Sequence, residues 1–347
     1  MTITTNKVLL NQQRNVSLVT MIQDVTNELN VGKRPGIVVL PGGGYSMCSD
    51  REAEVVAYPY LAAGYHAFVL RYSVGEHRHW PNPLSDWDQA MEYILEHAGE
   101  WGLDPNKIAV IGFSAGGHLA ASAATMAKNR PNAAILGYAA LCQDVAEACQ
   151  PGMGAPSPID HVDRRTPPCF LFAARDDEIV SMENPLEFMR KLDRFDITFE
   201  CHIYPFGGHG FSTAEPQLVD SVCRRAHNWV SDSIGFLEDV FGVLTPKGLQ
   251  EPVCPGKVNG NYEPTLSTEC TYGYVKSCPQ GVAAIAPVIE TMDRVISSAY
   301  GDSALANMVF GKFKLGTILG FLNKTPEEIK EIDKLLRTVK NPRYSEV

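Results

Sequence analysis

The sequence has no long apolar run, no block of basic residues and no paired cysteine motif, and each absence excludes a class of protein. No stretch of the 347 residues approaches the roughly 20 consecutive apolar residues that span a bilayer, so we expect no membrane-spanning helix and no membrane partner. A net charge of −10 without a cluster of Lys and Arg argues against nucleic-acid binding. The expected partner is a small molecule.

The cysteines and the N-terminal residues bear on the compartment. Nine cysteines are present, an odd number without any C-x-x-C pair, so we expect no zinc site and free thiols in a reducing compartment. The first residues, MTITTNKVLLNQQRNVSLV, lack a basic region followed by an apolar core and a small-residue cleavage site. These features predict a cytoplasmic protein.

What the sequence does contain is a serine bounded by glycines at a strand-to-helix transition. Residues 107–120 read KIAVIGFSAGGHLA, in which the β-branched run predicts a buried strand and the small residues predict a helix that packs closely on a sheet. In a Gly-x-Ser-x-Gly turn of this kind, the hydroxyl of Ser114 would stand at the carboxyl end of the sheet. The backbone N–H of Ala115 would face a developing oxyanion. Because isolated matches to this pattern are common by chance, the serine needs partners.

Strand and helix patterns alternate through most of the chain, which is typical of a parallel sheet covered on both faces. The fold class that we predict is α/β, with a mostly parallel central sheet flanked by helices, over residues 1–243. After antiparallel strands at 7–10 and 16–22, we expect strands at 37–40, 67–71, 108–111, 134–139, 169–173 and 197–204, and helices at 51–64, 83–101, 115–127, 184–195 and 215–230. Residues 244–347 are expected to form a linker and a small helical module, because apolar stripes recur there at helical spacing.

Candidate partners for the serine follow the last two strands expected in the sheet. A serine hydroxyl is a weak nucleophile near neutral pH, so it needs a base, and the base needs an orienting acid. Asp176 and Asp177 follow the strand at 169–173, and His209 follows the strand at 197–204 with a glycine on each side. His118, one helical turn after Ser114, is better explained by packing than by contact with substrate.

Two loops complete the expected site. PGGGY at 41–45 directly follows a strand, and its glycines permit a backbone that turns N–H groups toward an anion. The segment 143–168, rich in Pro, Gly and Asp, is long enough to act as a lid that frames a pocket. Tyr45, Arg51 and Trp80 are further candidates for the pocket lining.

In this order, PGGGY, GFSAGGH, FAARDDEIV and YPFGGHGF resemble the motifs of the intracellular carbohydrate-acetylesterase and xylan-esterase-like (BD-FAE-like) branch of the α/β-hydrolases. The resemblance covers roughly residues 5–240. It implies that Ser114 is the nucleophile, that His209 is the base and that Asp177, three positions before Val180, is the orienting acid.

The same resemblance implies the rest of the site and the reaction. The N–H groups of Gly43, Gly44 and Ala115 would form the oxyanion hole, although a proline stands here where relatives carry His-Gly-Gly-Gly. The sequence thus predicts a serine esterase that hydrolyses short-acyl esters, acetylated sugars above all, through an acyl-enzyme. No metal and no organic cofactor is called for.

Two other functions remain open from the sequence alone. A peptidase or amidase of the related dipeptidyl-peptidase branch would use the same three residues, but neither its large extra domain nor amine-anchoring carboxylates are evident. A ligand-binding protein that lost catalysis would be supported by loss of one of the three, and all are present. The apolar stripes after residue 244 would pack on the hydrolase unit or on a second subunit, so a homo-oligomer is a further expectation.

Overall fold

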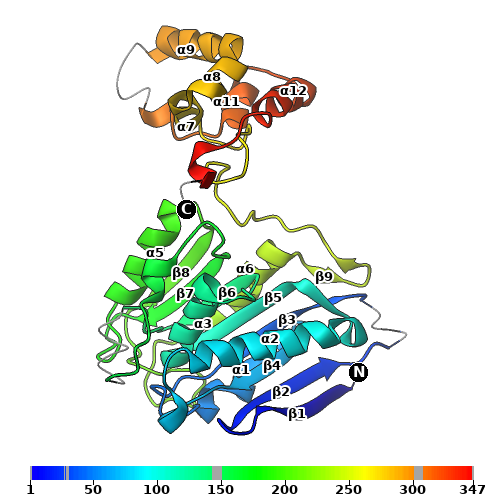
Figure 1. Cartoon of the computed structure of the whole chain (residues 1–347), viewed down its shortest axis with the longest axis vertical. Coiled ribbons are helices and arrows are strands. Elements are labelled where there is room, and N and C mark those ends of the chain that lie inside the picture. The colour runs from blue at the N-terminus through cyan, green and yellow to red at the C-terminus, as the bar shows by residue number, and fades with distance from the viewer. Residues whose placement is uncertain (1, 27, 29–30, 143–150, 301–307, 346–347) are drawn as a thin grey trace. The chain divides into compact units, whose positions relative to one another are not determined.

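The computed structural model describes residues 2–26, 28, 31–142, 151–300 and 308–345, and the chain divides into two compact units, Met1–Gly256 and Lys257–Val347 (Figure 1). Residues 244–256 belong to the first unit. They include a short hairpin of β9 (Leu244–Thr245) and β10 (Gly248–Leu249), and the boundary expected from the sequence lies before this hairpin.

The first unit is built around an eight-stranded sheet in the order β1-β2-β4-β3-β5-β6-β7-β8. The neighbours from β4 to β8 pair in parallel, and β2 pairs antiparallel with β1 and β4, so the prediction of a mostly parallel sheet is confirmed. The strands are β1 (Ile3–Asn11), β2 (Val16–Gln23), β3 (Arg34–Leu40), β4 (His66–Arg71), β5 (Leu103–Phe113), β6 (Ala133–Gly137), β7 (Cys169–Ala174) and β8 (Phe199–Tyr204).

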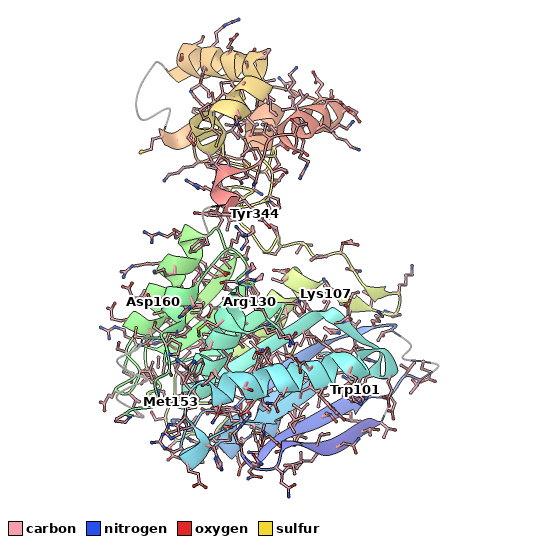
Figure 2. The ribbon with its side chains drawn as sticks, in the orientation of Figure 1. Trp101, Lys107, Arg130, Met153, Asp160 and Tyr344 are labelled. Atoms are coloured by element: carbon pink, nitrogen blue, oxygen red, sulfur yellow. The ribbon has the colours of Figure 1, made fainter. Side chains whose placement is uncertain are left out.

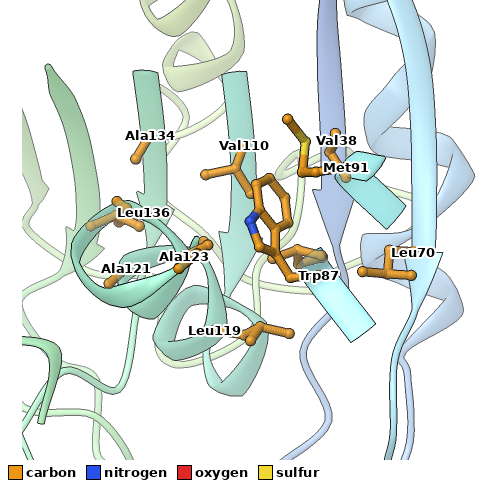
Figure 3. Close-up of a cluster of buried hydrophobic side chains, with 14 of the residues drawn as sticks. Val38, Leu70, Trp87, Met91, Val110, Leu119, Ala121, Ala123, Ala134 and Leu136 are labelled. Carbon is orange, nitrogen blue, oxygen red and sulfur yellow. The ribbon is translucent and has the colours of Figure 1, made fainter. Parts of the chain in front are cut away.

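Helices cover both faces of this sheet because its strands are apolar on both sides. In β3, Val38 and Leu40 belong to one buried cluster, while Ile37 and Val39 belong to another. The first cluster packs under α2 (Asn82–Trp101), α3 (Ala115–Met126) and α5 (Glu183–Arg194), and the second under α1 (Glu54–Ala62) and α6 (Asn228–Phe241). Figure 3 shows the first cluster, where the fully buried ring of Trp87 on α2 lies beside Val110 of β5.

The register brings the carboxyl ends of the parallel strands to one edge. Leu40 at the end of β3 pairs with Gly112, and Phe113 at the end of β5 pairs with Gly137. The last residues of β7 and β8 pair with each other in the same way. The loops that follow these strands carry the candidate site residues, so they meet at this edge.

The predicted helix at 215–230 is wrong, because α6 begins only at Asn228. Residues 215–227 form successive turns, in which Leu218 N donates to Glu215 O and Ala226 N donates to Cys223 O, each at 2.8 Å. Cys223 N donates to Phe206 O, in the loop after β8, rather than along a helix. The apolar residues here are spaced as on one face of a helix. The chain forms turns instead, and their apolar side chains pack against the second buried cluster.

The second unit is a helical module with its own apolar cluster. Its helices are α7 (Tyr272–Ser277), α8 (Pro279–Ala284), α9 (Ala286–Tyr300), α11 (Leu315–Phe321) and α12 (Pro326–Leu336), and Tyr344 lies near its end (Figure 2). A capping box begins α12, since Glu328 N donates to the Thr325 side chain and Thr325 N donates to the Glu328 carboxylate.

None of the helices among the described residues combines the length and apolar character needed to cross a bilayer.

Candidate active site

Ser114 occupies a sharp turn between β5 and α3, with φ 52° and ψ −116°, a backbone conformation that residues with a side chain rarely adopt. The flanking glycines allow this turn to close. A Cβ on Gly112 would lie 2.1 Å from the carbonyl oxygen of Gly116, and a Cβ on Gly116 would lie 2.1 Å from that of Leu40. The helix therefore approaches the sheet at a distance that only glycine permits, and this approach aims Ser114 out of the sheet edge.

Replacing Gly116 by alanine tests this close packing. We expect Gly116→Ala to lower the free energy of unfolding by about 1–3 kcal/mol, because the new methyl group would meet the main chain of Leu40 and Pro41, which cannot rotate away. Ester hydrolysis should fall as well, since the displaced residues begin the glycine loop. Urea unfolding and an ester assay measure both effects.

Gly235→Ala is the matched control for that substitution. Gly235 lies inside α6, and a Cβ there would meet nothing within 4 Å. The alanine should leave activity unchanged and stabilise the fold by about 0.5–1 kcal/mol. Equal effects of the two substitutions would contradict the packing argument.

The structure brings Ser114, His209 and Asp177 together in a chain of hydrogen bonds. His209 Nε2 lies 2.9 Å from Ser114 Oγ, and His209 Nδ1 lies 2.7 Å from Asp177 Oδ2. Because a carboxylate oxygen accepts, Nδ1 carries the proton of the neutral ring, and Nε2 is left to accept from the serine hydroxyl. This arrangement can deprotonate Ser114.

The two neighbouring aspartates have different partners. The side chain of Asp177 is fully buried, and its Oδ1 accepts from the N–H groups of Ile179 and Val180 at 2.9 and 2.8 Å, while Oδ2 faces His209. Oδ1 of Asp176 instead accepts from the N–H groups of Gly207 and Gly208, at 2.9 and 3.0 Å. Asp177 thus contacts the ring of His209, and Asp176 holds the loop that carries it.

The start of the glycine loop after β3 is held by buried side chains. Tyr72 Oη donates to the carbonyl of Pro41 at 2.6 Å, and Gly42 N donates to Glu52 Oε2 at 2.9 Å. Since the N–H of Gly42 is occupied, Gly43 and Gly44, which have positive φ, remain as the residues of the loop that face the cleft with Ser114. Ala115 is the first residue of α3, so its N–H has no acceptor four residues earlier in the helix.

His118 has the structural role that we expected. It is fully buried, its Nε2 donates to the carbonyl of Pro156 at 2.9 Å, and its Nδ1 accepts from Tyr45 Oη at 2.7 Å. Burial lowers the pKa of His118 to about 4, so the ring is neutral at neutral pH. Through this ring α3 holds Tyr45 at the end of the glycine loop.

Ser114 and His209 open into a cleft of 420 Å³. Of the three residues suggested for the lining, Arg51 is present, whereas Tyr45, which is buried, and Trp80, which is partly buried, are absent. The lining residues are Gly43, Gly44, Met47, Ser49, Arg51, Glu52, Ser114, Ile179, His209 and Gly210. Within the described ranges, no three His, Cys, Asp or Glu side chains gather as a metal ion would require.

The proposed lid at 143–168 is described only from residue 151. Residues 143–150 lie outside the described residues, so the lid stays a prediction. The described part carries Met153 and Asp160 (Figure 2), and Met153 is buried in the first apolar cluster.

Sequence reasoning missed Glu52 and Tyr138. The run SDRE at 49–52 has the charged composition of a surface helix start, yet Glu52 is only 3% exposed and accepts from Tyr138 Oη at 2.5 Å. No local pattern distinguishes such an acid from an exposed one, because its burial depends on strands far away in the sequence.

Comparisons with known proteins agree with the fold. The chain matches the BD-FAE family over residues 25–140 and the Prolyl oligopeptidase family over residues 146–236. It is 41% identical to MGS-M1, an alpha/beta hydrolase enzyme from a Medee basin deep-sea metagenome library, with a TM-score of 0.64 over 69% of this chain and 98% of that one. The acetyl ester-xyloside bifunctional hydrolase from Caldicellulosiruptor lactoaceticus is 28% identical, with a TM-score of 0.59 over 68% of this chain and 96% of that one.

The acetylxylan esterase of Xylanibacter ruminicola is 31% identical over 228 residues, which are 60% of this chain and 47% of that esterase. The chain spans about half, or less, of the length of the curated relatives it matches. The match to nearly the whole of an α/β hydrolase at 41% identity, and the sheet and strand-turn-helix geometry described above, show that this chain belongs to the esterase-like α/β-hydrolase family.

Proposed function

We propose that this protein is a serine esterase that hydrolyses short-acyl carboxylic esters, with acetylated carbohydrates as its substrates. The observation that carries the proposal is the hydrogen-bonded series Ser114, His209 and Asp177 at the carboxyl edge of the sheet. The similarity to an acetylxylan esterase and to an acetyl ester-xyloside hydrolase supports the acetyl and sugar parts.

The reaction proceeds in two steps. His209 Nε2 takes the proton of Ser114 as Oγ attacks the ester carbonyl, and Asp177 stabilises the imidazolium through Nδ1. The N–H of Ala115 and those of Gly43 and Gly44 stabilise the oxyanion. The alcohol leaves with the proton from Nε2. Water then attacks the acyl-enzyme and gives its proton to Nε2, which returns it to Ser114 Oγ as the bond to the acyl group breaks and the carboxylic acid leaves.

Acetate esters should be turned over faster than octanoate esters, by about 10-fold or more in kcat/KM. Two exposed apolar side chains line the cleft, Met47 and Ile179, at 54% and 59% exposure, so a long acyl chain would stay largely in water. A series of p-nitrophenyl esters measures the preference, and acetate release from acetylated xylo-oligosaccharides tests the sugar. Faster turnover of octanoate would favour a lipase-like function instead.

A peptidase is the second candidate, and the match of residues 146–236 to the Prolyl oligopeptidase family favours it. This segment carries Asp177 and His209 but neither Ser114 nor the glycine loop. Comparing p-nitrophenyl acetate with aminoacyl p-nitroanilides separates the two candidates, because the same three residues would serve both bonds.

The cytoplasmic location and a homo-oligomer stay predictions. For Lys257–Val347 we propose a structural or oligomerising role, because this unit contains none of the four motifs.

A further inference from the structure

A buried carboxylate lies beside the candidate catalytic residues, and the proposed mechanism does not use it. Glu52 ends the short 3₁₀ helix Asp50–Glu52, is almost fully buried, and lines the same cleft as Ser114 and His209. An ionised carboxylate in such a place is costly unless its oxygens accept hydrogen bonds, so its partners reveal what it does.

One carboxylate oxygen holds the start of the glycine loop. Gly42 N donates to Glu52 Oε2 at 2.9 Å, and the carbonyl of Gly42 accepts from Ser49 N at 2.9 Å. A Cβ on Gly42 would lie 2.6 Å from that carboxylate oxygen and 3.2 Å from Ser114 Cβ, so Gly42 is enclosed between the two side chains. The peptide that precedes Gly43 and Gly44 is therefore oriented through Glu52.

The other oxygen reaches the loop that carries His209. Tyr138 Oη donates to Glu52 Oε1 at 2.5 Å and accepts from Ser212 N at 3.0 Å. The ring of Tyr138 packs edge-on against that of His209, with 5.1 Å between the ring centres. Tyr138 follows β6 with φ 33°, and Ser212 lies three residues after His209.

We propose that Glu52 is a positioning residue that couples the glycine loop to the histidine loop, so that the oxyanion donors and the base keep their places relative to Ser114. This inference rests on the proposed function. Glu52 is given no part in proton transfer, because its oxygens accept from Gly42 and Tyr138 and not from Ser114 or His209.

The charge of Glu52 distinguishes this role from simple packing. Desolvation by burial raises the pKa of Glu52, although its hydrogen bonds from Tyr138 and Gly42 and the nearby His209 and Arg51 oppose that shift. A carboxylic acid whose pKa is higher in the folded than in the unfolded state makes its full contribution to stability at a pH below its pKa in the unfolded state. This contribution is lost as the pH rises through its pKa in the folded state. Burial thus disfavours the charged form of Glu52, so on this account an uncharged glutamine of the same shape should cost no stability.

Glu52→Gln is the substitution that tests the proposal, with three readouts. We expect kcat for p-nitrophenyl acetate to fall about 10- to 100-fold, with KM changed by less than about 3-fold, because the substitution disturbs donors that act in the transition state. The rate at which a serine-directed phosphonate labels Ser114 should fall in the same proportion. The melting temperature should not fall.

Two further variants serve as comparisons. Glu54→Gln removes a nearby carboxylate that pairs with Arg71 outside the cleft, and it should change neither rate. Tyr138→Phe removes only the hydroxyl that links Glu52 to Ser212. Combined with Glu52→Gln it should cost little more than Glu52→Gln alone, since contacts in one network are not additive.

Each outcome has one meaning. An active parent whose Glu52→Gln variant keeps kcat within about 3-fold, or loses it only in proportion to unfolding, overturns the role of Glu52 while the esterase proposal stands. A parent that hydrolyses no ester, yet is phosphonylated at Ser114 faster than the variant, supports Glu52 and overturns the esterase proposal. A parent that neither hydrolyses an ester nor is phosphonylated at Ser114 contradicts both proposals.

Discussion

Ser114→Ala will abolish ester hydrolysis and leave the protein folded. The hydroxyl is the group within 2.9 Å of His209 Nε2 at the strand-turn-helix, so its removal leaves the base with nothing to activate. Loss of such a serine in a comparable triad costs about 10⁶-fold in kcat, and the residual rate comes from the oxyanion donors and binding. The methyl group also fits the turn, because it is smaller than the side chain that it replaces. Turnover of p-nitrophenyl acetate and the circular dichroism spectrum are the measurements.

Ser122→Ala provides a control on the same helix. Ser122 is fully buried in α3, and its Oγ is among the buried side-chain atoms of the described residues that have no hydrogen-bond partner. Removing it should leave activity unchanged and stability equal or higher. Residual activity of Ser114→Ala within about tenfold of the parent would refute the role of Ser114.

Asp177→Asn should lower kcat about 10⁴-fold, the second-largest effect expected here. Its Oδ2 holds the Nδ1–H of His209, and an amide that presents N–H₂ to this nitrogen would favour the wrong tautomer. The introduced amide would still have an oxygen to accept from Ile179 and Val180, so the following turn should persist.

Asp176→Asn is the matched comparison, since it makes the same chemical change one residue away. Its amide oxygen can still accept from Gly207 and Gly208, and it does not contact the ring of His209, so we expect a loss of about tenfold or less. Measuring kcat for both asparagine variants at the same pH decides the assignment, and a larger loss for Asp176→Asn would reverse it.

Local patterns in the sequence predicted the elements whose signals are strong over a short window. The β-branched run and small-residue helix around Ser114 became β5 and α3. Patterns that depend on partners elsewhere were less reliable. Residues 215–230 have helical apolar spacing, but residues 215–227 form local turns, and the amide of Cys223 donates to Phe206 in the loop after β8.

The order of strands and motifs in the sequence determined the α/β class and the edge at which Ser114, Asp177 and His209 would lie, because apolar periodicity and turn residues are local properties. Only the tertiary structure decided which groups touch. It places Asp177 against His209 and Asp176 against the glycines before it, and it buries Glu52 between Gly42 and Tyr138. The physical reason is that burial and hydrogen-bond partners arise from strand register, which joins residues many positions apart and leaves no trace in a short stretch of sequence.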